Sequence, residues 1–514
     1  MTMKKIIIAL FVGLMILPGC STDILDLKNP AQFDEATYFK TQKECQEVIA
    51  ACYSVLTMRP FYSRDWYFMF DLLSGHATKT SELEVALVQF EEFTFQPENE
   101  YIDWAWIGFY RMSMRALLAI EKLTEWETKS DAEAAYKDIM LGEAYFFHGY
   151  AYYFLTELWG DVPYHESWES NKNEPAKPRT PYAEVQLKIE EDFITALAKL
   201  PESWSDNFYG RVTKDATRAM LGKLYLTRGE NDKAISAFES IKTSAYHPDY
   251  YRLFACGNYT SPEIIFQVMH KFYGWGEGNS YHMFGGKETW GGTATNCGRH
   301  MEYGFNDWGN VSIPDAAANK FRYTLNGSTY IDPRIQDVMY GDGVMGAPIP
   351  PPINEYFTYK PQDGTSMSGY KWKKYCQYED NEHVDIGDQG DYSSILIRVA
   401  DIKLLIAEAC IAKGDYAKAR TLINEVRTRA AVNAEPYSDL NASNAFEILK
   451  RERYIELFGE QHYWFDLVRW DRQGKVNMLD ELKSSAKPKH KKFPIPTQEK
   501  DTNPFMVIQS EGWN

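Results

Sequence analysis

Apolar positions along this chain of 514 residues recur every three to four residues over long stretches, the period of a helix that packs on one side. The first such run, 41–56, begins with Thr41 as an expected N-cap and Glu44 as its capping-box partner. The same period predicts helices over eight later runs: 104–123, 131–158, 181–200, 214–227, 231–241, 399–412, 416–430 and 445–469. The pattern therefore predicts a mainly α-helical protein.

Two of these helices share a sequence motif. The spacing L-G-x-x-Y occurs at 141–145 and again at 221–225, and the second copy is followed by Ala234 and Phe238. This is the tetratricopeptide pattern, in which a small residue lets two antiparallel helices approach and an aromatic ring fills the groove between them. A third, weaker pair is expected around the turn at 413–415. We therefore expect tetratricopeptide-like helix pairs, with the motif residues serving core packing.

Between these helices lies a loop-rich insertion, residues 246–394, in which glycine and proline interrupt every longer pattern. Within it, 274–292 contains seven glycines among nineteen residues, together with large aromatic rings. Ordering such a loose backbone costs conformational entropy, so a fixed loop of this composition needs a function to retain it. Because binding groups concentrate on loops held by a rigid scaffold, this insertion is the expected binding region.

The N-terminus has the layout of an export signal. Lys4 and Lys5 precede the apolar run 6–17, and the sequence Leu-Pro-Gly-Cys that ends at Cys20 resembles a bacterial lipobox. The run is short for a membrane span, so we expect a cleaved signal peptide over 1–19 and lipidation of Cys20. The expected organisation then continues with a tether, an N-terminal helical region and a C-terminal region: 20–40, 41–245 and 246–514.

Composition narrows the functional classes. Hydrophobic residues make up 44% and charged residues 25%, as in ordinary globular proteins, whereas aromatic residues reach 15%. The net charge of −17 argues against a nucleic-acid partner, which requires basic neutralisation. There is no C-x-x-C, G-x-S-x-G, H-E-x-x-H or P-loop motif. His300 near Cys297 lacks a third metal ligand, so no metal and no cofactor is expected.

The insertion supplies the groups that carbohydrate recognition uses, namely flat rings for stacking and polar edges for hydroxyl groups. The alternative is that the rings hold the loop against the helices. Trp275 and Trp290 are the favoured ligand contacts, because their flanking glycines leave the ring faces open. The other candidates are Tyr281, Tyr303 and Trp308, with Asn296, Arg299, Asn306 and Asp307 as polar partners.

The chain resembles the SusD/RagB family of outer-membrane nutrient-binding lipoproteins. The motifs that carry the resemblance run in order along the chain: 20–26, 143–147, the G-D-V-P turn at 160–163, 213–216 with 221–225, 400–409, 423–429, 452–453, 466–470, 493–496 and 503–504. One departure is the segment 460–463, Glu-Gln-His-Tyr, where the family often has E-G-x-R. We interpret it as a local change in the packing of the scaffold.

The resemblance implies a non-catalytic, lipid-anchored protein of the outer membrane, exposed at the cell surface, that captures oligosaccharide or polysaccharide for a SusC-like TonB-dependent transporter. It also implies that the early loops contribute to binding, with Asp71, His76 and Trp104 as candidates. Three alternatives remain open: a peptide or glycoprotein-glycan binder of the same family, a surface glycoside hydrolase, and a tetratricopeptide adaptor that binds only protein. For a hydrolase, a carboxylate pair such as Glu302 and Asp307 can be nominated, but so can many others.

Overall fold

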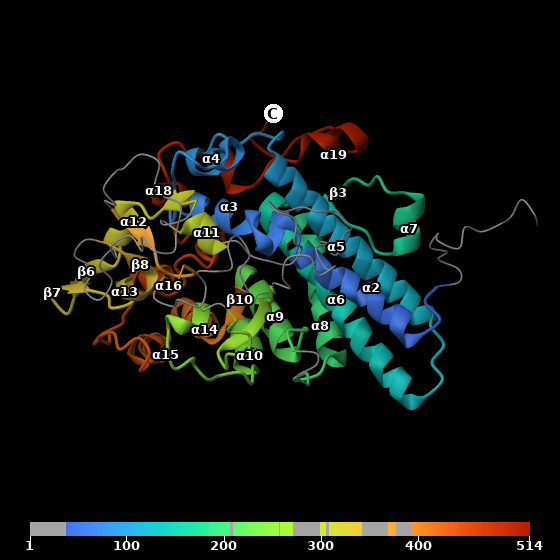
Figure 1. Cartoon of the computed structure of the whole chain (residues 1–514), viewed down its shortest axis with the longest axis horizontal. Helices are drawn as coiled ribbons and strands as arrows, with labels where there is room; N and C mark the ends of the chain where they lie inside the picture. The colour runs from blue at the N-terminus through green and yellow to red at the C-terminus, as the bar shows by residue number, and fades with distance from the viewer. Residues whose placement is uncertain are drawn as a thin grey trace, which may run out of the picture.

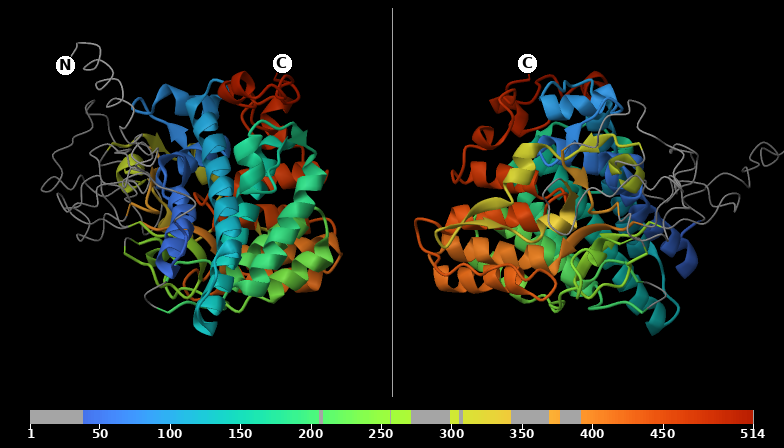
Figure 2. Two further views of the ribbon diagram at one scale, coloured as in Figure 1. Left: turned by 90° about the vertical axis from the view of Figure 1, so that its right-hand side faces the viewer. Right: turned by 60° about the vertical axis from the view of Figure 1, so that its left-hand side comes forward.

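The computed structural model describes residues 38–205, 209–255, 257–270, 299–304, 308–341, 369–376 and 392–513. The protein is mainly helical, as the hydrophobic pattern predicts (Figures 1 and 2). The predicted helices are present as α2 (Gln42–Leu56), α5 (Glu100–Glu125), α6 (Asp131–Trp159), α8 (Tyr182–Lys199), α9 (Lys214–Thr227), α10 (Asn231–Glu239), α14 (Val399–Ala412), α15 (Tyr416–Thr428), α16 (Ala445–Glu456) and α17 (Tyr463–Arg472).

Shorter elements connect these helices. The short helical segments are η3 (Arg59–Ser63, a π-helix), α3 (Asp65–Leu73), α4 (Val85–Glu92), α7 (Trp168–Asn173), η5 (Arg252–Phe254), α11 (Arg299–Tyr303), α12 (Asp315–Asn319), α13 (Ile335–Val338), α18 (Met478–Glu481), η7 (Pro488–Lys491) and α19 (Thr497–Thr502). The strands form antiparallel pairs: β1 (Thr78–Lys79) with β5 (Val311–Ser312), β2 (Val162–Pro163) with β3 (Arg179–Thr180), β4 (Ile264–Val268) with β10 (Ser394–Arg398), β6 (Arg322–Leu325) with β7 (Ser328–Ile331), and β8 (Met339–Tyr340) with β9 (Lys371–Trp372).

The long helices pack as successive pairs. α6 packs against both α5 and α8, α9 packs against α8 and α10, and α14 packs against α10, α15 and α16. A Cβ atom on Gly222 in α9 would overlap the ring of Phe238 in α10, so the close approach of these helices requires the glycine. A Cβ on Gly142 would lie 3.0 Å from the side chain of Leu200. The role of both glycines predicted from the tetratricopeptide pattern is therefore confirmed.

One predicted helix end is confirmed by the structure, whereas one predicted helix is interrupted. The capping box at α2 is present, with the Thr41 amide donating to the Glu44 carboxylate at 2.8 Å. The prediction of one helix over 445–469 is wrong, because the chain turns between α16 and α17. Gly459 and Gln461 have φ of 72° and 61° in this turn, left-handed values that interrupt a helix. Periodicity alone does not reveal such a turn, since the apolar positions continue through it.

The core is rich in aromatic side chains, which accounts for much of the aromatic excess. Trp66 in α3 lies 4.5 Å from Phe70 and stacks on Phe465 of α17 at 5.9 Å between ring centres. Cys45 and Cys52 are buried and not bonded to each other, as their spacing in α2 predicts. Within the described ranges, no helix has both the length and the apolar character needed to cross a bilayer.

Candidate ligand-binding face

The described parts of the insertion are tied to the scaffold by short strand pairs. β5 pairs with β1 of the early chain, and β10, which leads directly into α14, pairs with β4. A single bridge joins Ile313 to Tyr370. Residues distant in the sequence therefore meet at the base of the insertion, where α11 lies close to α3 in Figure 1.

Several residues that the sequence nominates lie outside the described residues. These are Trp275, Tyr281 and Trp290 of the glycine-rich stretch, together with Cys20, Asn296, Cys297, Asn306 and Asp307. The nominated residues that the structure describes are Asp71, His76, Trp104, Arg299, His300, Glu302, Tyr303 and Trp308.

Three of the nominated residues form a buried cluster. The Arg299 guanidinium lies 2.7 Å from Asp71 Oδ2, and the Tyr303 hydroxyl donates to the same oxygen at 2.8 Å. Asp71 and Tyr303 are fully buried, and Arg299 is 5% exposed. Burial, reinforced by the Asp71 carboxylate, holds the pKa of Tyr303 well above its usual value. The structure thus places these side chains at the base of the face, where they bond α11 to α3, and not on its surface.

The turn between α16 and α17 completes this base. The Gly459 carbonyl accepts hydrogen bonds from Arg299 at 2.8 Å and from the Gln461 side chain at 2.7 Å. The Gln461 amide nitrogen also lies 3.2 Å from both carboxylate oxygens of Asp71. Gln461 stands where the family often has glycine, and its left-handed φ of 61° is one that glycine adopts without strain. Its side-chain bonds offset that strain.

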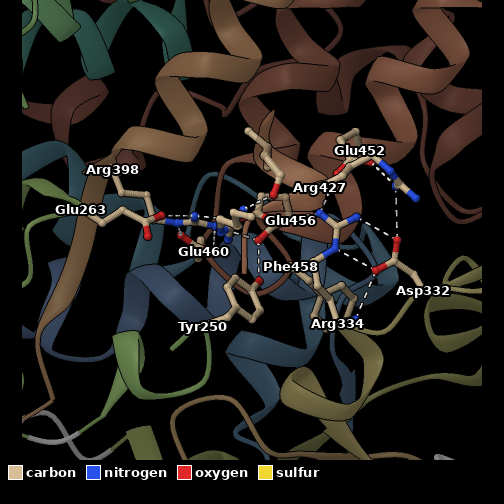
Figure 3. A network of polar contacts seen from close by, with 12 residues as sticks. Tyr250, Glu263, Asp332, Arg334, Arg398, Arg427, Glu452, Glu456, Phe458 and Glu460 are labelled. Atoms are coloured by element: carbon tan, nitrogen blue, oxygen red, sulfur yellow. Dashed lines mark hydrogen bonds and ion pairs between the residues drawn. The ribbon is translucent and has the colours of Figure 1, made fainter. Parts of the chain in front are cut away.

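A larger buried charge network fixes the same turn to the strands of the insertion (Figure 3). Arg398 at the end of β10 donates to Glu263, Glu456 and Glu460 at 2.7–2.8 Å. Lys374 donates to Glu460 at 2.7 Å, and burial lowers the pKa of this amine to about 8. The network continues through a second group of buried charges around α16, which comprises Asp332, Arg334, Arg427, Arg429 and Glu452. The charges pair throughout, as buried ions must.

Above this base lies the surface that we call the candidate face. It comprises the half-buried residues Arg59, Thr80, Glu84, Trp104 and Trp308, together with the buried Arg64. The Arg59 guanidinium lies 5.3 Å from the centre of the Trp104 ring and 3.9 Å from Glu84. Arg59 belongs to the π-helix η3, a rare element that often marks functional sites. Stacked indole and paired guanidinium and carboxylate groups suit a ligand with both flat apolar surfaces and hydroxyls.

The pairing of β1 with β5 links the chain next to Trp308 to the loop that carries Glu84. Thr80, which directly follows β1, donates from its hydroxyl to the Gly309 carbonyl at 2.8 Å. Arg64 bridges the two sides of the face, lying 2.7 Å from Glu84 and 2.5 Å from Glu302. The sequence indicated Trp104 and Trp308 but not Arg59, Arg64 or Glu84. Glu302, nominated as a possible catalytic acid, is buried and also accepts from Asn310.

A partly open pocket offers a second space for a ligand, but a small one. Its volume is about 70 Å³, and its lining combines aromatic residues such as Trp66 and Phe465 with polar ones such as Lys223, His462 and Asp466. By comparison, a cavity of about 150 Å³ holds benzene. A sugar ring therefore does not fit, and the open candidate face is the better site for an oligosaccharide.

Comparison with known proteins identifies the family. A sequence model described as "Starch-binding associating with outer membrane" matches residues 23–226, and a model described as "SusD family" matches residues 353–513. Together they match more than half of the chain, which belongs to the SusD/RagB family. The resemblance inferred from the motifs is therefore confirmed.

Individual relatives span nearly the whole chain. A SusD-like protein of Bacteroides ovatus is 24% identical over 509 residues, which cover 93% of this chain and 84% of that protein. SusD-like protein P2 of Formosa agariphila is 26% identical over 507 residues and covered to 91% on both sides. The solved structure of a laminarin-binding SusD-like protein superposes with a TM-score of 0.71 at 22% identity, over 92% of this chain and 100% of that one. This likeness shows a common fold.

Proposed function

We propose that this chain is a non-catalytic, lipid-anchored protein of the outer membrane that captures oligosaccharide or polysaccharide at the cell surface and delivers it to a SusC-like TonB-dependent transporter. The observation that carries the proposal is the candidate face, where the Trp104 ring lies against Arg59 and Arg59 pairs with Glu84. Trp308 directly precedes Gly309, whose carbonyl is bonded to Thr80 of the same face. Support also comes from the relatives, since one related structure is that of a laminarin-binding protein and one matching family model is described as starch-binding.

The physical reasoning favours weak, reversible capture. An open face with a few rings and hydrogen bonds leaves a small surplus after the costs of association, so we expect dissociation constants of about micromolar to millimolar. Weak binding suits a protein that must release its ligand to a transporter. The buried base beneath the face keeps the contact residues in place before binding, which reduces the ordering cost.

Calorimetry tests ligand class and catalysis together. Purified residues 21–514 are titrated with laminarin, starch, xylan, mannan and galactan, and each mixture is then analysed for shorter products. We expect saturable binding to at least one polysaccharide, with the polymer left intact. No binding to any glycan would contradict the proposal, and release of oligosaccharide by the purified protein would favour a glycoside hydrolase instead.

The sequence candidates in the glycine-rich stretch are tested in the same titration. We expect Trp275→Ala and Trp290→Ala to weaken binding of the same polysaccharide, because exposed indole rings stack on sugar faces. If both variants bind like the parent protein, these two rings do not belong to the binding site. Such a result would not contradict the proposed function itself, which rests on the candidate face.

Anchoring and partnership need separate measurements in cells. We expect Cys20→Ala to move the protein from the membrane fraction to the soluble fraction, because the acyl chains on Cys20 would provide the anchor. Retention of this variant in the membrane would contradict lipidation at Cys20. Copurification of the unaltered protein with a TonB-dependent barrel would support the proposed transport partner, and purification without one would contradict it.

A further inference from the structure

The cations of the candidate face are already neutralised by the protein itself. Arg64 lies within 2.7 Å of Glu84 and 2.5 Å of Glu302, and Arg59 lies 3.4 Å from Asp65 and 3.9 Å from Glu84. The Arg59 side chain remains 24% exposed and can still donate to a neutral hydroxyl, whereas Arg64 is buried and bonded through all three nitrogens. A carboxylate or sulfate on a ligand, however, would meet the negative charges that already pair with them.

The surroundings of the face repeat this pattern. Lys79, at the end of β1, forms an ion pair with Glu92, and Arg299 below the face pairs with Asp71. Glu82 on the exposed loop after β1 forms no ion pair with any residue in the described parts of the chain. The side of the face formed by this loop therefore carries an excess of negative charge.

The sequence of the insertion points the same way. Residues 246–394 contain 11 Lys and Arg and 18 Asp and Glu, which gives this segment a net charge of 11 minus 18, or −7. A site for acidic polysaccharides normally presents unpaired Arg or Lys, because such ligands bind through charge-assisted hydrogen bonds and are attracted by a positive potential. The insertion has a net negative charge, and the arginines of the candidate face, among the described residues, are both paired with carboxylates.

We propose that the face selects neutral glycans and rejects glycans that carry uronate or sulfate groups, with the Glu84 carboxylate occupying the arginines that an anionic sugar would need. This inference rests on the proposed function and adds the charge class of its ligand. Recognition then depends on ring stacking and on hydrogen bonds to hydroxyls, and both are insensitive to salt.

The first test compares neutral and anionic polymers and their salt dependence. Residues 21–514 are titrated with laminarin, starch, xylan, mannan and galactan, and in parallel with alginate, polygalacturonate and chondroitin sulfate. We expect a neutral polymer to bind, with a dissociation constant that changes less than about twofold between about 50 and about 500 mM NaCl. Tighter binding of an anionic polymer, weakened by salt, would overturn the inference but leave glycan capture intact. Binding of no polymer at all would overturn both.

The second test removes the carboxylate that Arg59 and Arg64 share, while Asp65 and Glu302 stay in place. Glu84→Gln removes one of the carboxylates that pair with Arg59 and Arg64 without changing side-chain size. Glu82→Gln removes the same charge nearby, at a residue that pairs with neither arginine. We expect Glu84→Gln to raise the affinity for alginate relative to the neutral polymer by about fivefold or more, and Glu82→Gln to raise it by clearly less. Equal effects of the two variants, or no effect of either, would show that the pairing does not set the selectivity.

Discussion

Replacing Arg398 by methionine is the sharpest test of how the insertion is held to the scaffold. Arg398 is fully buried and donates five hydrogen bonds, to the carboxylates of Glu263, Glu456 and Glu460 and to the Glu456 carbonyl. Methionine keeps much of the side-chain volume but removes the charge and the donors. Glu460 retains Lys374 as a partner at 2.7 Å. Glu263, by contrast, loses the Arg398 guanidinium that lies 2.8 Å away.

The expected cost follows from these contacts. Removing one partner of a buried ion pair costs about 3–5 kcal/mol, because the remaining charge stays buried without compensation. We expect the free energy of unfolding, measured by urea titration with tryptophan fluorescence, to fall by about that amount for Arg398→Met. Adding Glu263→Gln to this variant should recover part of the loss, since a neutral amide replaces the unpaired carboxylate.

A surface pair supplies the control for this prediction. Lys188 and Glu191 form an ion pair 3.1 Å apart with side chains 43% and 67% exposed. Lys188→Met should change the free energy of unfolding by less than about 0.5 kcal/mol. A loss below about 1 kcal/mol for Arg398→Met, or no recovery with Glu263→Gln, would refute the argument that buried pairing fixes β10 to the turn after α16.

Three further predictions test other parts of the account. Gly222→Ala should lower the free energy of unfolding by about 2 kcal/mol or more, despite the better helix propensity of alanine, and a double-mutant cycle with Phe238→Ala should show strong coupling. Gly459→Ala should lower the free energy of unfolding by at least about 2 kcal/mol, because its Cβ would lie 2.7 Å from the buried Trp372 indole. Gly474 has a similar φ but open space around it, so Gly474→Ala should lower the free energy of unfolding by only about 1 kcal/mol. Burial would raise the pKa of Glu408, but the adjacent arginine lowers it to about 2, so its stabilising effect is present above about pH 4.5 and is lost as the pH falls toward 2. The decline of stability between about pH 5 and 2, measured by urea unfolding, should therefore be shallower in Glu408→Gln, and an unchanged decline would contradict the assignment.

The helical scaffold could be predicted from the sequence because its signals are local. The 3.6-residue period located the long helices, and Gly222 with Phe238 indicated a close helix pair that the structure confirms. The break after α16 was missed, because Gln461 in a left-handed conformation leaves no mark in the hydrophobic pattern. The sequence signals of this turn were Gly459 and the departure from the family motif at Gln461.

The site was harder to predict because its contacts are long-range. Arg299 and Asp71 were predicted to bind ligand, but 228 positions separate them, and the sequence could not show that they pair with each other in the buried interior. Arg59 and Glu84 were missed for the same reason, since a charged residue acquires its role only when folding places it against a ring or a countercharge.

The central claim is that the candidate face binds glycan, and calorimetry of two tryptophan variants tests it most directly. Trp168 of α7 is the matched control, because it lies far from the candidate face. The backbone amide of the adjacent Glu169 donates to the carboxylate of Glu121, and Glu121 is about 25 Å along α5 from Trp104. For the neutral polysaccharide that binds the unaltered protein, Trp104→Ala and Trp308→Ala should each weaken binding about tenfold or more, and Trp168→Ala less than about twofold. Unchanged affinity in both face variants, or an equal loss in the control, would contradict the account.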